Sequence, residues 1–445
     1  MGELDILRKE ILENDSFCFY PFLELSTNPS GHIKPCCYYT DVMKTNNDII
    51  GILNGHTFES AWNSDHMISL REDIHKNMTP KNCNVCVRDG AASMRVRSIQ
   101  EYKNNINVLQ LVKNTIDNSY VAEHTPIILE LKPSNLCNLK CVMCNSYDSS
   151  QVAKELRDLS KKYGGIIVKA GRFSSISGKE GIYEEHEEFK GIDQPDWSDD
   201  EAVWNSFEKI APHLEVLSFA GGEPTLISFV LKVLNYCVDN DFAKNITVFV
   251  SSNFTNLNKN FFELMPKYKK FELIASIDGY GKVNEYARFP SKWSQVSTNY
   301  ILAKEYMKYP NVKILSNITV SILNVFNLVE LLNWIEERAI EYPYFKEWPY
   351  NLNLLFGPSE QQITVLPESL KKIAIERLTE YLETSQILKI FPGMESKINL
   401  VISELNKSSN NRLLEKFKYN ISILDSHRDI SIKEYIPDLA EMFDE

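Results

Sequence analysis

Three cysteines, Cys137, Cys141 and Cys144, lie in the run CNLKCVMC with the spacing C-x3-C-x2-C. This spacing places three thiols on one short loop, close enough to bind a single small inorganic group. A structural metal site is closed by four protein ligands, whereas a catalytic site leaves a coordination position open. A [4Fe–4S] cluster held by three cysteines has one free iron. The loop is predicted to hold a reactive centre, with buried cysteines or a zinc site as the alternatives.

The spacing in CNLKCVMC resembles that of the radical S-adenosylmethionine (SAM) enzymes. The resemblance implies that the three cysteines hold a [4Fe–4S] cluster and that its free iron chelates SAM. It also implies that an electron from the cluster cleaves SAM to a 5′-deoxyadenosyl radical. The apolar run 127–131 before the loop is typical of a strand. A strand that leads into the cysteine loop agrees with this resemblance.

A second candidate segment, Gly221-Gly222-Glu223-Pro224, follows the strand-like run 214–220. The two glycines let the backbone approach a ligand closely, because no Cβ stands in the way. Glu223 adds an acceptor, and Pro224 stiffens the exit while removing one donor. In the resembled family this motif receives the amino group of SAM, so the four residues are predicted to bind the cofactor. An ordinary turn is the alternative.

Short polar side chains also stand where later strand-like runs end. Hydroxyl and amide groups suit hydrogen bonds to a ribose or to the methionyl carboxylate, and an arginine fork binds a carboxylate through two hydrogen bonds. The predicted SAM-binding residues are Ser251, Ser252, Asn253 and Ser276. The candidates for catalysis are Asp278 and Arg288, by similarity to the same enzymes. Asn317 and Ser321, on the following strand, are further candidates.

A second cysteine group lies upstream. Cys18 is followed by twelve residues, Gly31, four residues and Cys36, and the pair Cys83-x2-Cys86 comes later. The stretch 22–37 is typical of a β-hairpin with an Asn-Pro-Ser-Gly turn, which would bring Cys18 beside Cys36. The pattern resembles the twitch or SPASM auxiliary-cluster motif of radical SAM enzymes. With too few cysteines for two extra clusters, it implies one, in a module that precedes the core instead of following it.

Zinc remains an alternative for this upstream group, because four thiolates in two pairs also suit a structural zinc site. The glycine spacing favours Cys36 as the ligand over Cys37, and Cys37 is either a fifth thiolate facing the substrate or a packed residue. Cys237, in an apolar helical run, is predicted to serve packing. The histidines of the module lack ligand-like spacing and are predicted to be non-ligands: His32, His56, His66 and His75.

Composition narrows the class of protein. The chain has 445 residues, nine cysteines and a net charge of −12, with 43% hydrophobic and 24% charged residues. These values are typical of a globular protein with two or three domains. The acidic balance argues against a nucleic-acid partner, and no apolar run is long enough to span a membrane. A cytoplasmic location is expected. The acidic stretch 179–201 is interpreted as a solvated, mobile insertion.

Strand-like and helix-like runs alternate from about residue 125, which predicts parallel strands joined by helical crossovers. The expected fold is α/β: a partial (β/α)6 TIM-type barrel as radical SAM core, with the active site at the carboxyl ends of the strands. The expected domains are an auxiliary iron–sulfur module at 1–124, the core at 125–345 and a mostly helical extension at 346–445. No chemistry is evident in the extension.

The expected function is that of a radical SAM enzyme that abstracts hydrogen from a substrate C–H bond. The resemblance implies modification of a peptide, with a twitch-type dehydrogenase of a sugar or aminocyclitol as an alternative. It also implies an external electron donor such as flavodoxin or ferredoxin. A non-enzymatic zinc-binding protein is the alternative from a different class.

Overall fold

The computed structural model describes residues 2–45, 48–90, 93–169, 171–176, 197–341 and 348–444. Most of the acidic stretch 179–201, expected to be a mobile insertion, lies outside the described residues. The chain divides into two compact units. Unit 1 comprises Met1–Ser134, Gln194–Phe249 and Lys267–Lys269; unit 2 comprises Asn135–Asp193, Val250–Pro266 and Lys270–Glu445.

Unit 1 contains a sheet with the strand order β8-β5-β1-β2. Strand β5 pairs in parallel with β1 and with β8, whereas β1 and β2 are antiparallel. A separate small hairpin pairs β3 with β4. The strands of this unit are β1 (Glu24–Thr27), β2 (Ile33–Lys34), β3 (Lys44–Thr45), β4 (Asp48–Ile49), β5 (Ile128–Leu131) and β8 (Val216–Phe219).

The predicted hairpin is confirmed by β1 and β2, which pair with Ser26 opposite Lys34. Its turn is closed by a hydrogen bond from the Gly31 N–H to the Asn28 carbonyl at 2.9 Å. Gly31 has a φ of +76°, a conformation that a side chain disfavours. The glycine therefore serves the turn that returns the chain toward Cys36.

Amphipathic helices accompany the sheet of unit 1. Several begin with a side chain that accepts a hydrogen bond from the first turn, such as Ser64 before α4 and Asn105 before α7, as is usual for an N-cap. The helices of this unit are α1 (Glu3–Glu13), α2 (Tyr20–Leu23), α3 (Phe58–Trp62), α4 (Asp65–His75), α5 (Asn84–Asp89), α6 (Met94–Tyr102), α7 (Ile106–Asp117), α9 (Glu201–Ile210) and α10 (Ser228–Asp239).

Unit 2 contains three parallel strands in the order β10-β11-β12, and the antiparallel pair β6 and β7. Strand β9 (Thr247–Ser252) begins in unit 1 and ends in unit 2. Buried and half-buried positions alternate along β9, as expected for a strand whose two faces differ. The strands of this unit are β6 (Ile166–Lys169), β7 (Arg172–Ile176), β10 (Lys270–Ser276), β11 (Val312–Val320) and β12 (Tyr350–Leu354).

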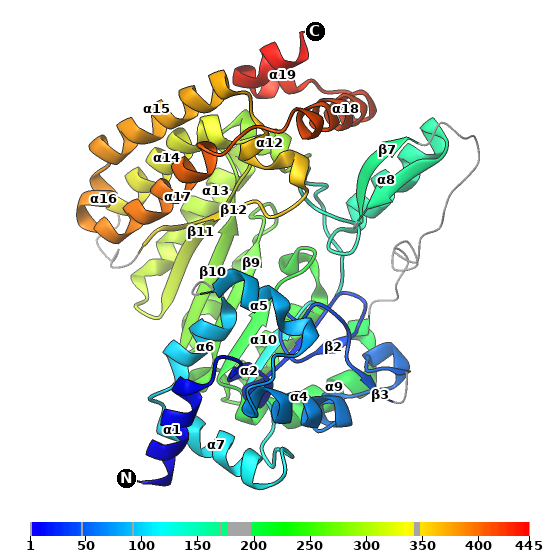
Figure 1. The fold of residues 1–445 in the computed structure, drawn as a ribbon, viewed down its shortest axis with the longest axis vertical. Helices are drawn as coiled ribbons and strands as arrows, with labels where there is room; N and C mark the ends of the chain where they lie inside the picture. The colour runs from blue at the N-terminus through cyan, green and yellow to red at the C-terminus, as the bar shows by residue number, and fades with distance from the viewer. Residues whose placement is uncertain are drawn as a thin grey trace. The chain divides into compact units, whose positions relative to one another are not determined.

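Helices connect the parallel strands of unit 2 and follow them to the end of the chain (Figure 1). They are α8 (Ser150–Tyr163), α11 (Lys259–Leu264), α12 (Lys282–Ala287), α13 (Trp293–Lys304), α14 (Leu328–Ile340), α15 (Glu368–Thr384), α16 (Gln386–Ile390), α17 (Glu395–Leu405), α18 (Asn411–Arg428) and α19 (Ile432–Tyr435).

The predicted α/β class with parallel strands and helical crossovers is confirmed. Two features escaped the sequence reading: β12 adds a parallel strand beyond β11, and the β6–β7 hairpin follows α8. In the described ranges, none of the helices has both the length and the apolar character needed to cross a membrane.

Candidate metal centres

Four predicted ligands of the upstream group lie together in unit 1. Cys18, Cys36, Cys83 and Cys86 line one cavity of about 560 Å³, counted to its open mouth. All four are free thiols. Sequence positions up to 68 residues apart thus meet around one space, as the hairpin and the C-x2-C pair predict.

Local structure explains how Cys18, Cys83 and Cys86 reach the cavity. Cys18 stands between the fully buried Phe17 and Phe19, and its sulfur lies 3.7 Å from the hydroxyl of Ser98 on α6. The same hydroxyl accepts a hydrogen bond from the Phe19 N–H at 3.2 Å. Cys83 ends a short 3-10 helix (Lys81–Cys83), and α5 follows at once. The flanking aromatic core and α6 therefore fix the first ligand, and a helix start presents the last two.

Burial shifts the ionisation of these thiols. It raises the pKa of Cys18 to about 12, with the charges of Cys83 and Cys86 adding to the rise. It also raises the pKa of Cys83 to about 11, together with the charge of Cys86. Clustered, buried thiolates need a cation to balance them, because burial and like charges both disfavour ionisation. Four such sulfurs fit an iron–sulfur cluster or zinc.

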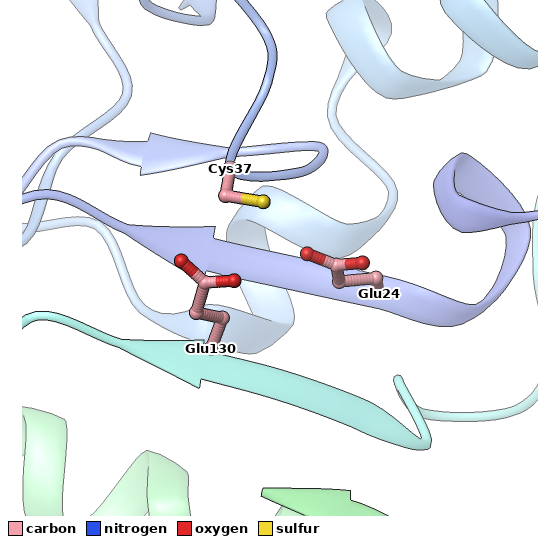
Figure 2. A group of neighbouring side chains, drawn as sticks. All are labelled: Glu24, Cys37 and Glu130. Carbon is pink, nitrogen blue, oxygen red and sulfur yellow. The ribbon is translucent and has the colours of Figure 1, made fainter. Parts of the chain in front are cut away.

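The structure separates the two adjacent cysteines Cys36 and Cys37. Cys36 lines the cavity with the other three thiols, and Cys37 is not among its lining residues. The donor atom of Cys37 lies instead within 4.8 Å of a carboxylate oxygen of Glu24 and of Glu130 (Figure 2). The geometry thus agrees with the glycine spacing in favouring Cys36 as the fourth ligand of the cavity.

The other cysteine loop lies in unit 2. Cys137 is buried, and Cys141 and Cys144 are half-buried. Two backbone hydrogen bonds anchor the loop to the last residue of α12 and the segment after it. The Val142 N–H donates to the Ala287 carbonyl at 2.9 Å, and the Lys140 N–H donates to the Phe289 carbonyl at 2.7 Å. The backbone of the loop is therefore held on both sides of Cys141.

The amino end of α8 gives this loop further support. Ser149 caps the helix by accepting from the Val152 N–H, and its hydroxyl donates to the Leu139 carbonyl at 2.7 Å. The Cys137 N–H donates to the Ser150 hydroxyl at 3.1 Å. Two serines at one helix start therefore hold the first half of the loop.

An arginine on α18, far along the chain, also contacts the loop. Arg428 donates to the Lys140 carbonyl at 2.8 Å and binds both carboxylate oxygens of Glu155 at 2.8 and 2.7 Å. Burial raises the pKa of Glu155, but the hydrogen bonds and charges of Arg428 and Lys140 outweigh it, so that the pKa is lowered. The sequence reading missed this contact, because nothing in the pattern of α18 distinguishes Arg428 from other helical arginines.

Cys141 and Cys144 line a second cavity, of about 520 Å³ when it is counted to its open mouth, and Arg172, Glu155 and Arg428 also line it. Burial raises the pKa of Cys141, while the charges of Arg288 and Arg428 partly offset that rise. Arginines beside thiols favour the thiolate form that binds iron. Cys137, Cys141 and Cys144 stay the predicted ligands of this loop, and Arg288 and Arg428 are the cations whose charges act on Cys141.

Asp278 and Arg288, the predicted catalytic residues, form an ion pair with a distance of 2.7 Å between Oδ2 and a guanidinium nitrogen. Asp278 is fully buried, and its other oxygen accepts from the Thr319 N–H at 2.7 Å. Arg288 directly follows Ala287, whose carbonyl anchors the cysteine loop. The Asp278–Arg288 ion pair therefore lies next to the backbone that holds the cysteine loop, and the guanidinium of Arg288 faces Asp278.

The predicted polar residues at strand ends lie in different settings. Asn253, just after β9, donates to the Asn138 side-chain oxygen at 2.9 Å, so it contacts the cysteine loop. Ser252 is buried and accepts from the Phe254 N–H at 3.1 Å. Ser251 is half-buried within β9, and Ser276 ends β10 opposite Asn317. Ser321 is buried, and its N–H donates to Asn324 at 2.7 Å.

The Gly221-Gly222-Glu223-Pro224 segment directly follows the end of β8 in unit 1. Both glycines have positive φ, +74° and +53°. A Cβ on Gly221 would lie 2.9 Å from the Cβ of Lys132, so no larger residue fits. Glu223 is 1% exposed and accepts from the Thr225 hydroxyl at 2.7 Å. The carboxylate is thereby fixed at the start of a short 3-10 helix.

Three of the histidines that were predicted not to bind metal contact other polar side chains. His66 lies 2.9 Å from the hydroxyl of Tyr39, and His75 lies 3.0 Å from that of Tyr120. His32 contacts the Asn28 amide at 3.1 Å. Cys237 is fully buried in α10. In the described structure these contacts account for three of the histidines, and the burial of Cys237 fits packing.

Comparison with known families gives one match. Residues 18–87 match the SPASM family, described as an iron-sulfur cluster-binding domain. The predicted auxiliary iron–sulfur module is therefore confirmed. The match contains Cys18, Cys36, Cys83 and Cys86, the four cysteines of the unit 1 cavity.

Several solved structures are similar at low levels. Streptococcus suis SuiB bound to S-adenosylmethionine has a TM-score of 0.34 and 13% identity, over 71% of this chain and 61% of that one. Native anSMEcpe with bound AdoMet has a TM-score of 0.35 and 17% identity, over 60% of this chain and 61% of that one. SuiB bound to its precursor peptide SuiA has a TM-score of 0.34 and 12% identity, over 75% and 76%.

The chain spans less than two thirds of the length of the SuiB and anSMEcpe structures with bound cofactor. The comparison with curated proteins gave no match.

Proposed function

We propose that this protein is a radical SAM enzyme with one auxiliary iron–sulfur cluster. The observation that carries the proposal is the presence of two separate thiol groups on one chain. Four cysteines line a cavity within a matched iron–sulfur domain, and three others lie on an anchored C-x3-C-x2-C loop. Three ligands leave one iron of a [4Fe–4S] cluster open, whereas four close it.

In this proposal some residues hold the first cluster and others bind SAM. Cys137, Cys141 and Cys144 hold the first cluster, which, when bound, supplies the electron that cleaves SAM to a 5′-deoxyadenosyl radical. The Gly221-Gly222 backbone offers donors and acceptors at close range, and Glu223 offers a fixed carboxylate to the SAM amino group. Ser251, Ser252, Asn253 and Ser276 are proposed to contribute hydrogen bonds to the cofactor.

Asp278 and Arg288 are proposed to act through the loop that they support. Their ion pair fixes the segment whose carbonyls at Ala287 and Phe289 bind the loop backbone. The cavity beside Cys141 and Cys144 is also lined by Arg428 and its ion-pair partner Glu155. Cys18, Cys36, Cys83 and Cys86 are proposed to hold the auxiliary cluster.

We propose a peptide as the substrate class, because peptide maturases dominate the auxiliary-cluster group that the sequence resembles. Dehydrogenation of a sugar or aminocyclitol is a second candidate, since the cysteine count provides for one auxiliary cluster. A flavodoxin or ferredoxin is the proposed electron donor, and the cytoplasm the proposed location. We propose the domain boundaries 1–124, 125–345 and 346–445 for designing separate expression tests.

Anaerobic purification tests the proposal. We expect a brown protein with about eight irons per chain, as two [4Fe–4S] clusters require, and formation of 5′-deoxyadenosine from SAM with a strong reductant. Replacing Cys137, Cys141 and Cys144 together by alanine is expected to abolish that product and to leave the auxiliary iron. Cys237→Ala is the matched control and keeps both. A colourless, zinc-only protein, or SAM cleavage by the triple variant, would contradict the proposal.

A further inference from the structure

Three side chains of unit 1, each of a type that can bind a metal ion, converge outside the cysteine cavity. They are Glu24 on β1, Glu130 on β5 and Cys37 after β2, and their donor atoms all lie within 4.8 Å of one another (Figure 2). In Figure 2 the sulfur and the two carboxylates turn toward a common space above the sheet. Two neighbouring strands and the segment after a third thus supply one small group of donors.

Strand register explains this convergence. Strand β1 pairs in parallel with β5, with Ser26 opposite Glu130. Because side chains alternate along a strand, Glu24 and Ser26 share one face, and Glu130 faces the same way from the neighbouring strand. Antiparallel pairing places Lys34 of β2 opposite Ser26, and the chain then returns with Cys37 over Glu24. The hairpin that delivers Cys36 to its cavity therefore delivers Cys37 to the carboxylates.

The charges of this group lack a matching ion pair. Glu24 is 3% exposed, and within the described ranges no lysine or arginine nitrogen lies within 4.0 Å of Glu24 or Glu130. Lys34 is near, but its ammonium donates to the Cys37 carbonyl at 3.4 Å. Glu24 also accepts a backbone hydrogen bond from Cys37, and Lys132 is a second cation whose charge acts on Cys37. Burial and the neighbouring carboxylate of Glu130 raise the pKa of Glu24. Burying carboxylates without a paired cation is costly, so a bound cation would stabilise this group.

We propose that Glu24, Cys37 and Glu130 bind a divalent cation of the Zn²⁺ type through one thiolate sulfur and two carboxylate oxygens. Zn²⁺ accepts thiolate and carboxylate ligands, whereas Mg²⁺ and Ca²⁺ take oxygen donors. Three protein ligands leave one position for water or another ligand. With a thiolate, the three donors carry three negative charges, more than the nearby Lys34 and Lys132 together supply, and a divalent cation offsets the remainder.

This metal site is distinct from the four-cysteine cavity. Cys36 lines that cavity, whereas Cys37, Glu24 and Glu130 do not. The adjacent cysteines therefore serve two different sites, one built of sulfur alone and one of mixed donors. The inference stands on the geometry of β1, β2 and β5 and does not depend on the proposed function.

Metal analysis of the full-length, cluster-loaded protein tests the site. The protein is incubated anaerobically with one equivalent of Zn²⁺ and desalted, and zinc and iron are counted on the same sample. We expect one tightly held zinc per chain, with a zinc-edge X-ray absorption spectrum showing one sulfur at about 2.3 Å and oxygen neighbours otherwise. Cys37→Ser, Glu24→Gln and Glu130→Gln are each expected to lower zinc retention at least tenfold with iron unchanged.

Two further variants keep the test decisive. Cys237→Ser removes a buried thiol elsewhere in unit 1 and is expected to retain zinc. Cys37→His supplies another zinc ligand, so it is expected to retain zinc while its spectrum loses the sulfur neighbour. Absence of retained zinc in the wild type overturns the site, as does equal zinc in the Glu24→Gln and wild-type proteins. A spectrum with four sulfurs also overturns it, because the zinc would then occupy the cysteine cavity. Failure of the proposed function is seen separately, in the iron count and in 5′-deoxyadenosine.

Discussion

Asn253 donates a side-chain hydrogen bond to Asn138 with a distance of 2.9 Å, which ties the end of β9 to the residue after Cys137. Asn138 in turn donates to the Thr255 hydroxyl at 2.7 Å, and Thr255 donates its N–H back to Asn253 at 2.9 Å. Three polar side chains thus close a ring between a strand end and the cysteine loop. The ring gives Asn253 a positioning role that is separate from any contact with a cofactor.

Asn253→Ala is therefore expected to destabilise unit 2 by about 1–3 kcal/mol, because it leaves buried polar partners unsatisfied. It is also expected to lower the yield of 5′-deoxyadenosine through a misplaced loop. Urea unfolding and product assays on the same preparation measure both effects. Asn406→Ala is the matched control, since the Asn406 amide contacts its own exposed helix. Equal stability of Asn253→Ala and Asn406→Ala would show that the ring does not hold the loop.

Gly221 and Gly55 offer a comparison of backbone strain with and without a steric clash. Both have positive φ, +74° and +80°, but an added Cβ meets Lys132 at 2.9 Å at Gly221 and nothing within 4 Å at Gly55. Gly55→Ala is expected to cost about 1–2 kcal/mol from the left-handed conformation alone. Gly221→Ala is expected to cost more, because the clash is added, and to weaken SAM binding as well.

Thermal unfolding and SAM titration of the two glycine variants measure this difference. A Gly221→Ala protein as stable as Gly55→Ala would mean that Lys132 moves aside at no cost. Unchanged SAM affinity in Gly221→Ala would remove the glycine pair from the proposed cofactor site.

Sequence alone predicts those features of the molecule that are decided by residues close together in the chain. The hairpin around Gly31 follows from a local turn signal, and the convergence of Cys18 with Cys36 follows from the hairpin. The parallel strands follow from alternating apolar and helical runs. In each case the interactions that decide the structure lie within a few tens of residues of one another.

The parts that escaped prediction depend on distant pairing. Arg428 meets Lys140 and Glu155 only because α18 packs in unit 2, and helical periodicity does not say which arginine finds a partner. Glu24 and Glu130 lie on one face only through the register of β1 and β5. Strand β12 was missed because its run, YNLNL, is short and polar at alternate positions. Register and packing partners are long-range properties that composition and spacing do not encode.

The ion pair of Arg428 with Glu155 is expected to be a strong contributor to unit 2. Both side chains are almost fully buried, at 2% and 4% exposure. Removing Arg428 takes away its two hydrogen bonds to Glu155 and leaves Lys140, 3.0 Å away, as the cation beside that carboxylate. Arg428→Met is expected to cost about 1.5–3 kcal/mol, the range for hydrogen bonds to a charged group, because Lys140 still offsets part of the Glu155 charge. The double variant Arg428→Met/Glu155→Leu is expected to recover much of that loss, since apolar residues of similar size replace the pair without leaving a buried charge. Chemical denaturation of the three proteins measures the coupling. Additive losses in the double variant would contradict a direct pairing.

Cys36 and Cys37 provide the sharpest internal control for the auxiliary cluster, because they are adjacent in sequence and face different surroundings. Cys36 lines the cavity of the other three thiols, and Cys37 faces Glu24 and Glu130. Cys36→Ser is expected to lower the iron content by about four per chain, since one ligand of a [4Fe–4S] cluster is lost. Cys37→Ser is expected to keep all iron. The measurement is iron and sulfide analysis with electron paramagnetic resonance of the reduced protein, in which Cys36→Ser loses one of two signals. Loss of iron in Cys37→Ser, with full iron in Cys36→Ser, would assign the fourth ligand to Cys37. The backbone between Gly31 and Cys37 would then have to differ from the one described here.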